Sequence, residues 1–156
     1  MPRVQMDAER AVLHNEVYDI VRTLPLDGTE VAVDRDGWFG VARARIESGA
    51  LVVETRGFRP SAWGLGGEEA HGGGDVPSSD KKTLTERFSI SPDDRAMFYD
   101  YTLQDSAYLA EPKRGHVELT RVPVTTAIYP YVCDLESAGM WSRTRDDAPL
   151  LVTPRR

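Results

Sequence analysis

Residues 38–58 read WFGVARARIESGALVVETRGF, and this stretch decides the fold class. Within residues 38–47, charged residues alternate with the apolar residues Ala42, Ala44 and Ile46. A period of two is typical of a β-strand that buries one face. The dipeptide Ser48-Gly49 then precedes residues 50–58, which are rich in strand-forming residues. We therefore predict a β-hairpin whose strands are joined by a two-residue turn.

Similar short runs of Val, Thr, Tyr, Phe and Ile lie on both sides of this hairpin. They predict further strands at residues 17–24, 83–90, 96–104, about 115–122 and about 126–133. Residues 5–15 are the only candidate for a helix, from a weak apolar stripe. Successive hairpins without a βαβ unit predict an all-β fold, an antiparallel meander that closes into a small lipocalin- or calycin-like β-barrel. A β-sandwich is the alternative, and 156 residues fit one domain over residues 1–156.

Residues 59–82 differ in composition from the rest of the chain. They contain six glycines, two prolines and almost no β-branched residues. A segment of this length is too long for a simple hairpin connection. We predict a flexible glycine-rich loop, which would act either as a lid or as a disordered insertion.

Composition and charge exclude several classes of function. The net charge of −6 and the scattered arginines do not provide the clustered basic face that nucleic-acid binding requires. Cys133 is the single cysteine, so an intrachain disulfide is excluded. No apolar run has the length of a signal peptide or a membrane span. These features predict a cytoplasmic protein with neither nucleic-acid nor membrane partners.

The predicted strand at residues 83–90 carries a candidate catalytic residue. Glu86 has the same parity as Leu84, Phe88 and Ile90, so it points inward if these apolar side chains do. A buried carboxylate is costly unless it is paired or protonated. Glu86 is therefore a general acid/base in a pocket, the partner of an arginine in a structural ion pair, or a residue at a sheet edge open to solvent. On residues 96–104 one face carries Met97, Tyr99, Tyr101 and Leu103, of which Tyr99 and Tyr101 would donate hydrogen bonds to a substrate.

Aromatic and neighbouring side chains are the candidate ligand contacts. Apolar and aromatic residues line most small-molecule sites. We expect ligand contacts from Trp38, Trp63, His71, Phe88 and Met97. Core packing is the competing explanation for each aromatic residue. The three histidines lack any metal-ligand spacing, so neither a metal nor another cofactor is expected.

Several short motifs follow one another in a recognisable order, namely Leu51-Val52-Val53-Glu54-Thr55-Arg56-Gly57-Phe58, Glu86-Arg87-Phe88, and then Tyr99, Thr102, Asp105 and Pro112. This order resembles an uncharacterised family of bacterial β-rich proteins, many of them exported. Tyr131-Val132-Cys133 is similar to a terminal feature of that family. The chain departs from the family pattern at residues 45–49 and in the glycines after His71. It also has Asp134 where the family often has a histidine, and it lacks the usual export signal. The resemblance implies a β architecture and no particular activity.

Three functions are compatible with these features. The first is a cofactor-independent cyclase or isomerase that folds an apolar, polyketide- or terpenoid-like metabolite in its pocket, with acid/base help from Glu86. The second is a non-catalytic carrier of an apolar small molecule. The third is an interaction module with a filled core and an exposed patch or sheet edge. A homodimer is left open in each case.

Overall fold

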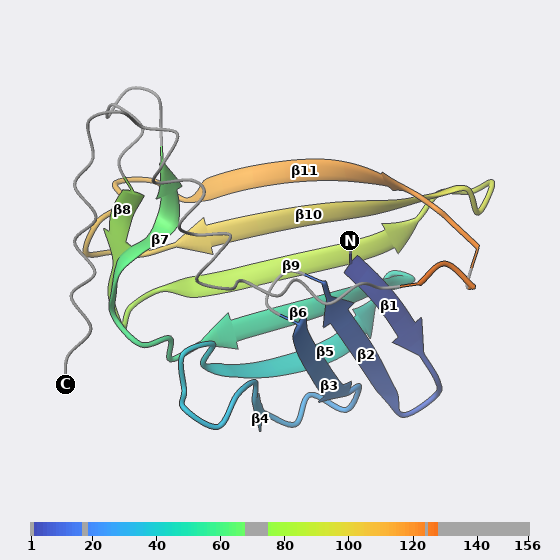
Figure 1. Ribbon diagram of the computed structural model, residues 1–156, viewed down its shortest axis with the longest axis horizontal. Helices are drawn as coiled ribbons and strands as arrows, with labels where there is room; N and C mark the ends of the chain where they lie inside the picture. Colours follow the sequence, from blue (N-terminus) through green and yellow to red (C-terminus); the bar gives the residue numbers. More distant parts are fainter. Residues whose placement is uncertain (1, 17–18, 68–74, 124, 128–156) are drawn as a thin grey trace, which may run out of the picture.

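The computed structural model describes residues 2–16, 19–67, 75–123 and 125–127. Over these residues the chain forms eleven β-strands and no α-helix (Figure 1). Every strand pairing is antiparallel, as the sequence predicts. The described residues contain no helix that is long and apolar enough to cross a membrane. The predicted strand at about residues 126–133 lies almost entirely outside the described residues.

The first sheet has three strands in the order β1-β2-β3. These are β1 (Pro2–Met6), β2 (Arg10–Asn15) and β3 (Ile20–Pro25). The helix candidate at residues 5–15 therefore forms the end of β1, a turn and β2 instead. Asp7 accepts hydrogen bonds from the backbone N–H groups of Glu9 and Arg10, and this favours a turn over a helix at that point. In β2, the side chains of Ala11 and Leu13 alternate with more exposed ones, which is the period of a strand.

The second sheet has six strands in the order β11-β10-β9-β6-β5-β4. Its strands are β4 (Val31–Ala32), β5 (Val41–Glu47), β6 (Ala50–Arg56), β9 (Thr83–Ile90), β10 (Ala96–Gln104) and β11 (Lys113–Thr120). The hairpin predicted within residues 38–58 is confirmed as β5 and β6. Ser48 and Gly49 both have positive φ, 51° and 78°, as a tight two-residue hairpin turn requires.

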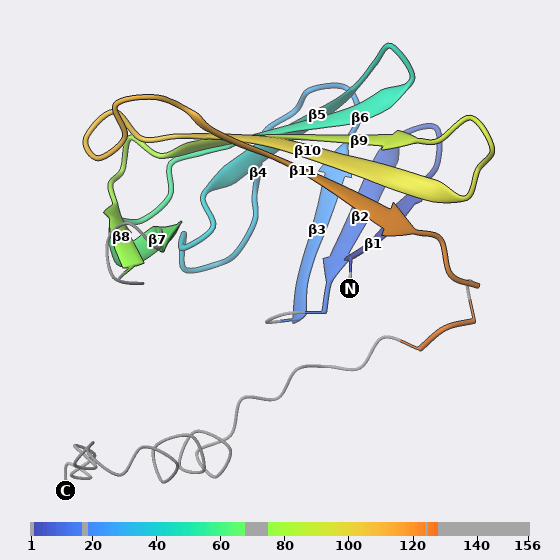
Figure 2. The ribbon, with the colours of Figure 1, turned by 90° about the horizontal axis from the view of Figure 1, so that it is seen from above.

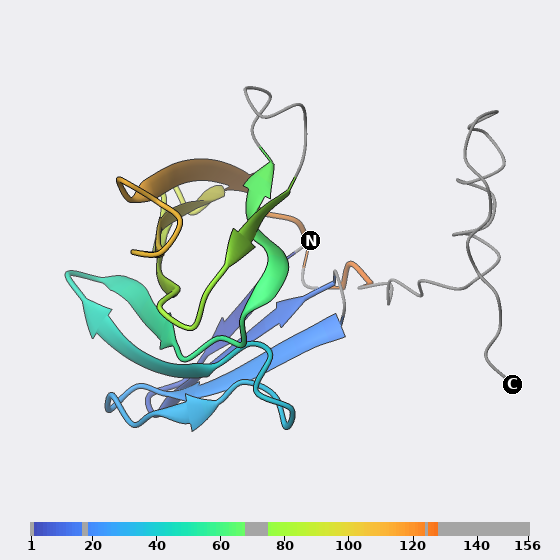
Figure 3. The same ribbon diagram turned by 90° about the vertical axis from the view of Figure 1, so that its left-hand side faces the viewer.

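Two strands lie inside the segment predicted as a loop. They are β7 (Ser61–Gly67) and β8 (Asp75–Ser78), which pair with irregular register as a separate two-stranded sheet. Figure 1 shows this hairpin at the left-hand end of the molecule, and Figure 3 views the molecule from that side. Residues 68–74 lie outside the described residues, so the flexibility of residues 59–82 stays a prediction.

The two larger sheets pack against each other around a shared core. In Figure 2 the strands of the three-stranded sheet run steeply across those of the six-stranded sheet. The core takes side chains from both sheets, namely Ala11, Leu13 and Leu24 from one and Ala42, Ala44, Leu51, Val53 and Phe88 from the other. No pairing among the described strands joins β4 to β11, so closure into a barrel stays a prediction.

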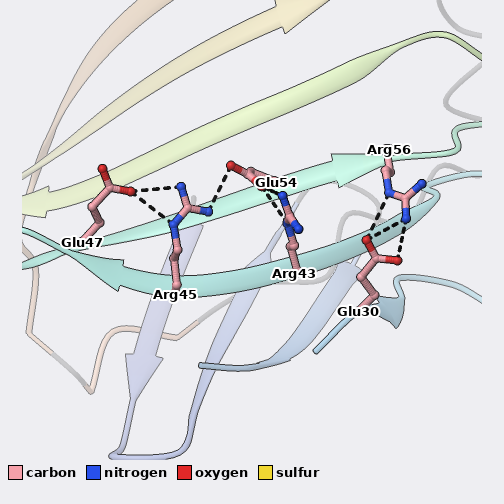
Figure 4. Close-up of polar contacts among 6 residues, drawn as sticks. All are labelled: Glu30, Arg43, Arg45, Glu47, Glu54 and Arg56. Atoms are coloured by element: carbon pink, nitrogen blue, oxygen red, sulfur yellow. Dashed lines mark hydrogen bonds and ion pairs between the residues drawn. The ribbon is translucent and has the colours of Figure 1, made fainter. Parts of the chain in front are cut away.

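The outer face of β5 and β6 carries a ladder of ion pairs (Figure 4). Arg43 and Arg45 of β5 both bind Glu54 of β6, with N–O distances of 2.6 and 3.0 Å. Arg56 binds Glu30 at 2.8 Å. Hydrogen bonds from Arg43, together with Arg45, outweigh partial burial and lower the pKa of Glu54. The interleaved arginines and acids therefore form a solvated strand face in which the charges pair with one another.

Candidate functional site

A buried carboxylate lies between the two packed sheets. Glu86 is only 4% exposed, so it faces inward with Phe88, as the alternation predicts. In the six-stranded sheet its neighbours in register are Val53 on β6 and Tyr101 on β10. The polar atoms of such a side chain need partners, because an unpaired buried carboxylate is strongly destabilising.

The main partner of Glu86 comes from the opposite sheet. Arg22, on β3, donates from Nη1 and Nη2 to the two carboxylate oxygens, and the Nη2–Oε1 distance is 3.0 Å. Burial alone would lower the pKa of Arg22, but the contact with Glu86 outweighs it and raises that pKa. The pair therefore joins the two sheets across the core as a bidentate ion pair.

Sequence reasoning missed Arg22, although a signal was present. Arg22 has the same parity as Leu24, which is fully buried, while Val21 and Thr23 are exposed. The strand predicted at residues 17–24 thus already placed this arginine on its inward face. An inward arginine and an inward glutamate on separate strands are expected to pair, because each compensates the buried charge and the hydrogen-bonding groups of the other.

The third member of the cluster is Tyr99 on β10. Its hydroxyl donates to Oε1 of Glu86 at 3.2 Å. Burial, and then the negative charge of Glu86, raise the pKa of Tyr99, so its hydroxyl remains a hydrogen-bond donor. The ring of Tyr99 stacks on Phe88 at 5.0 Å between centroids and lies 5.7 Å from the ring of Tyr101. Glu86 thus accepts three hydrogen bonds, two of them from a cation.

The larger cavity near this cluster opens between β1 and the ends of β9, β10 and β11. Its volume is about 480 Å³. Most of its wall is apolar and includes Val4, Leu51, Phe88, Met97, Leu119 and Val122. Two of the predicted ligand contacts, Phe88 and Met97, therefore line one cavity.

A smaller hollow of about 230 Å³ lies beside Tyr99. Tyr99 and Tyr101 line it, together with Phe58, Lys82, Leu84 and Leu103. Burial lowers the pKa of Lys82, whose ammonium lies 4.4 Å from the centroid of the Phe58 ring. The Tyr101 ring covers Gly115 of β11, where an added Cβ would overlap the ring. Glu86 is not among the described residues that line either cavity.

The remaining predicted contacts are not brought to this cluster. Trp38 lies before β5, is 48% exposed and packs its ring against Arg59, whose guanidinium carbon is 4.3 Å from the ring centroid. Trp63 belongs to β7, but its side chain is outside the described part, as is the whole of His71. Their roles in ligand binding stay predictions. Across the described ranges, no group of three or more His, Cys, Asp or Glu residues could hold a metal ion.

A second buried carboxylate fixes the segment that leads from β8 into β9. Asp105, which is 1% exposed, accepts hydrogen bonds from the N–H and hydroxyl of Ser79 at 2.6 and 2.7 Å. It also accepts one from the N–H of Ala107 at 3.0 Å. Burial raises the pKa of this carboxyl, but these hydrogen bonds outweigh it, so that the pKa is lowered overall. Asp105 therefore contributes to stability as an ionised acceptor.

This lowered pKa predicts a pH-dependent stability that Asp105→Asn removes. A carboxyl with a lowered folded-state pKa stabilises the fold above its unfolded pKa of about 3.9 and loses that contribution as the pH falls through the folded-state pKa. Urea unfolding of both proteins from neutral pH to about pH 3 checks this. We expect the wild type to lose more stability than the variant over that range. Parallel curves would show that Asp105 has no such role.

The family resemblance noted in the sequence stays a prediction. Compared with models of protein families, with curated proteins and with solved structures, the chain gave no match in any of the three.

Proposed function

We propose that this protein is a carrier that binds an apolar small molecule in the larger cavity between its sheets. One observation carries the proposal: the cavity has a volume of about 480 Å³ and a largely apolar wall that includes Phe88 and Met97. Ligand pockets usually enclose about 300–1,000 Å³ and are lined mostly by apolar and aromatic side chains. A filled-core interaction module would need no such space.

The contacts of Glu86 favour a carrier over an enzyme. Arg22 and Tyr99 occupy both oxygens of this carboxylate, and neither of the two cavities is lined by it. A general acid or base must reach the proton that it transfers. The proposal also includes the finer features predicted from the sequence, namely a lipocalin-like closed barrel and a cytoplasmic location.

A bulky substitution in the cavity wall tests this proposal. Met97→Trp is expected to weaken binding of the neutral dye N-phenyl-1-naphthylamine by about tenfold or more, because the indole would fill space that the ligand needs. Thr102→Trp is the matched control, since it adds the same indole to the opposite face of β10. Fluorescence titration measures both. A wild-type protein that does not bind the dye, or equal affinities in all three proteins, would contradict the proposal.

A second candidate function is the cofactor-independent cyclase or isomerase. The observation that favours it is the Tyr99 hydroxyl, which contacts Glu86 and belongs to a residue that lines the smaller hollow. In this alternative Tyr99 passes a proton between the substrate and Glu86. Native mass spectrometry would identify a co-purifying metabolite, and turnover of that metabolite would then be compared in wild type and Tyr99→Phe. If the wild type turns the metabolite over and Tyr99→Phe abolishes turnover without loss of binding, the enzyme is favoured. If the wild type binds the metabolite without turning it over, the carrier is favoured.

A further inference from the structure

Among the described residues, the rim of the larger cavity carries a net positive charge. Arg3 on β1 and Arg121 after β11 both line the cavity, with Asp94 as the acidic residue beside them. Asp94 is already paired with Arg121. Arg3 donates through Nη2 to the backbone carbonyl of Thr126 at 2.5 Å, and no carboxylate within the described ranges forms an ion pair with it. A half-buried guanidinium thus lies at the mouth of an apolar cavity, and no residue of the described ranges supplies it with an anionic partner.

Arg3 differs in this respect from the arginines on the outer face of the sheet. Arg43, Arg45 and Arg56 are each held by a carboxylate of the chain, and they line no comparable apolar space. The protein as a whole carries a net charge of −6, so an incoming anion is not attracted by the overall charge. The attraction has to be local, at Arg3.

We propose that the ligand of this cavity is an amphipathic carboxylate, with its apolar chain among Phe88, Met97 and Leu119 and its carboxylate on Arg3. This rests on the proposed carrier function and specifies its ligand class. A guanidinium presents parallel N–H donors that match the two oxygens of a carboxylate. A neutral head group would gain less from this contact, and an ammonium head group would be repelled.

Three compounds with the same ten-carbon chain test the head group, namely decanoate, 1-decanol and decylamine. Each is titrated against the dye-loaded protein at low ionic strength. Decanoate is expected to displace the dye at about tenfold lower concentration than 1-decanol, because hydrogen bonds to charged groups are stronger than neutral ones. Decylamine is expected to be the weakest of the three. Added salt should weaken decanoate and leave 1-decanol nearly unchanged.

Arg3→Gln is expected to abolish the preference for decanoate over 1-decanol while the affinity for 1-decanol stays the same. That unchanged affinity also shows that the variant is folded. Arg114→Gln is the matched control. It removes the same charge from the face of β11 opposite to Leu119, where Arg114 does not line the cavity, and it should keep the preference for decanoate.

Two results would overturn the inference and one would overturn the carrier function itself. Equal displacement by decanoate and 1-decanol in the wild type leaves the carrier function standing but removes the carboxylate preference. Binding to phosphatidylglycerol vesicles without binding to free decanoate would make the rim a lipid-surface contact. If neither the dye nor any of the ten-carbon compounds binds, the carrier function is wrong.

Discussion

Arg22→Met is expected to lower the free energy of unfolding by about 3–5 kcal/mol, because it leaves the carboxylate of Glu86 buried without its cation. Only 18% of the Arg22 side chain and 6% of the Glu86 side chain are exposed, so water can replace little of the lost contact. Tyr99 would remain as a neutral donor to Glu86, which is weaker than a guanidinium. Urea unfolding followed by tryptophan fluorescence measures the change.

Arg43→Met is the control for this experiment. It breaks an ion pair with Glu54 in which 51% of the arginine side chain is exposed, and exposed pairs contribute at most about 1 kcal/mol. A double variant, Arg22→Met with Glu86→Leu, is expected to recover much of the lost stability because no buried charge is left unpaired. If Arg22→Met costs no more than Arg43→Met, the pair does not hold the two sheets together.

Gly40→Ala is expected to lower the free energy of unfolding by about 3 kcal/mol. Gly40 is buried just before β5 and has a φ of +71°, a conformation that costs other residues about 1–2 kcal/mol. An added Cβ would also overlap the carbonyl oxygen of Arg56 and lie 3.1 Å from its carbonyl carbon. Backbone atoms of a paired strand cannot move aside as a flexible side chain can, so this overlap adds about 1–3 kcal/mol.

Gly37→Ala separates these two contributions. Gly37 has nearly the same φ, +72°, but nothing lies within 4 Å of a Cβ placed there. The same alanine should therefore cost about 1–2 kcal/mol at this position, from backbone strain alone. Equal losses of stability in both variants, measured by urea unfolding, would show that the approach of Gly40 to Arg56 is unimportant.

Local sequence patterns were sufficient for the central strands and for the orientation of Glu86. The alternation in residues 38–47 and the Ser48-Gly49 turn determine the hairpin β5–β6. Parity alone places Glu86 on the buried face of β9. These predictions succeed because a strand with one buried face must alternate, whichever element covers that face.

Features that depend on packing between sheets were not predictable in the same way. Arg22 lies 64 positions before Glu86 in the chain, and only the contact between the two sheets brings them together. The apolar stripe that suggested a helix at residues 5–15 is short enough to fit a strand equally well. The pairing of β7 with β8 had no signal, because glycine-rich segments have low strand propensity. The cavity beside Met97 lies between β1 and the ends of β9, β10 and β11, and no local sequence pattern predicts this arrangement of the two sheets.

The insertion of β7 and β8 between β6 and β9 has a consequence for folding kinetics. β6 and β9 are neighbours in the sheet, yet the chain between Arg56 and Thr83 must first close as a long loop. The two hairpins β5–β6 and β9–β10 need no such closure, so we expect them to form early and to dock along the β6–β9 seam late. Val53 lies on that seam, opposite Glu86. If docking is late, truncating Val53 should accelerate unfolding and leave refolding nearly unchanged in stopped-flow experiments.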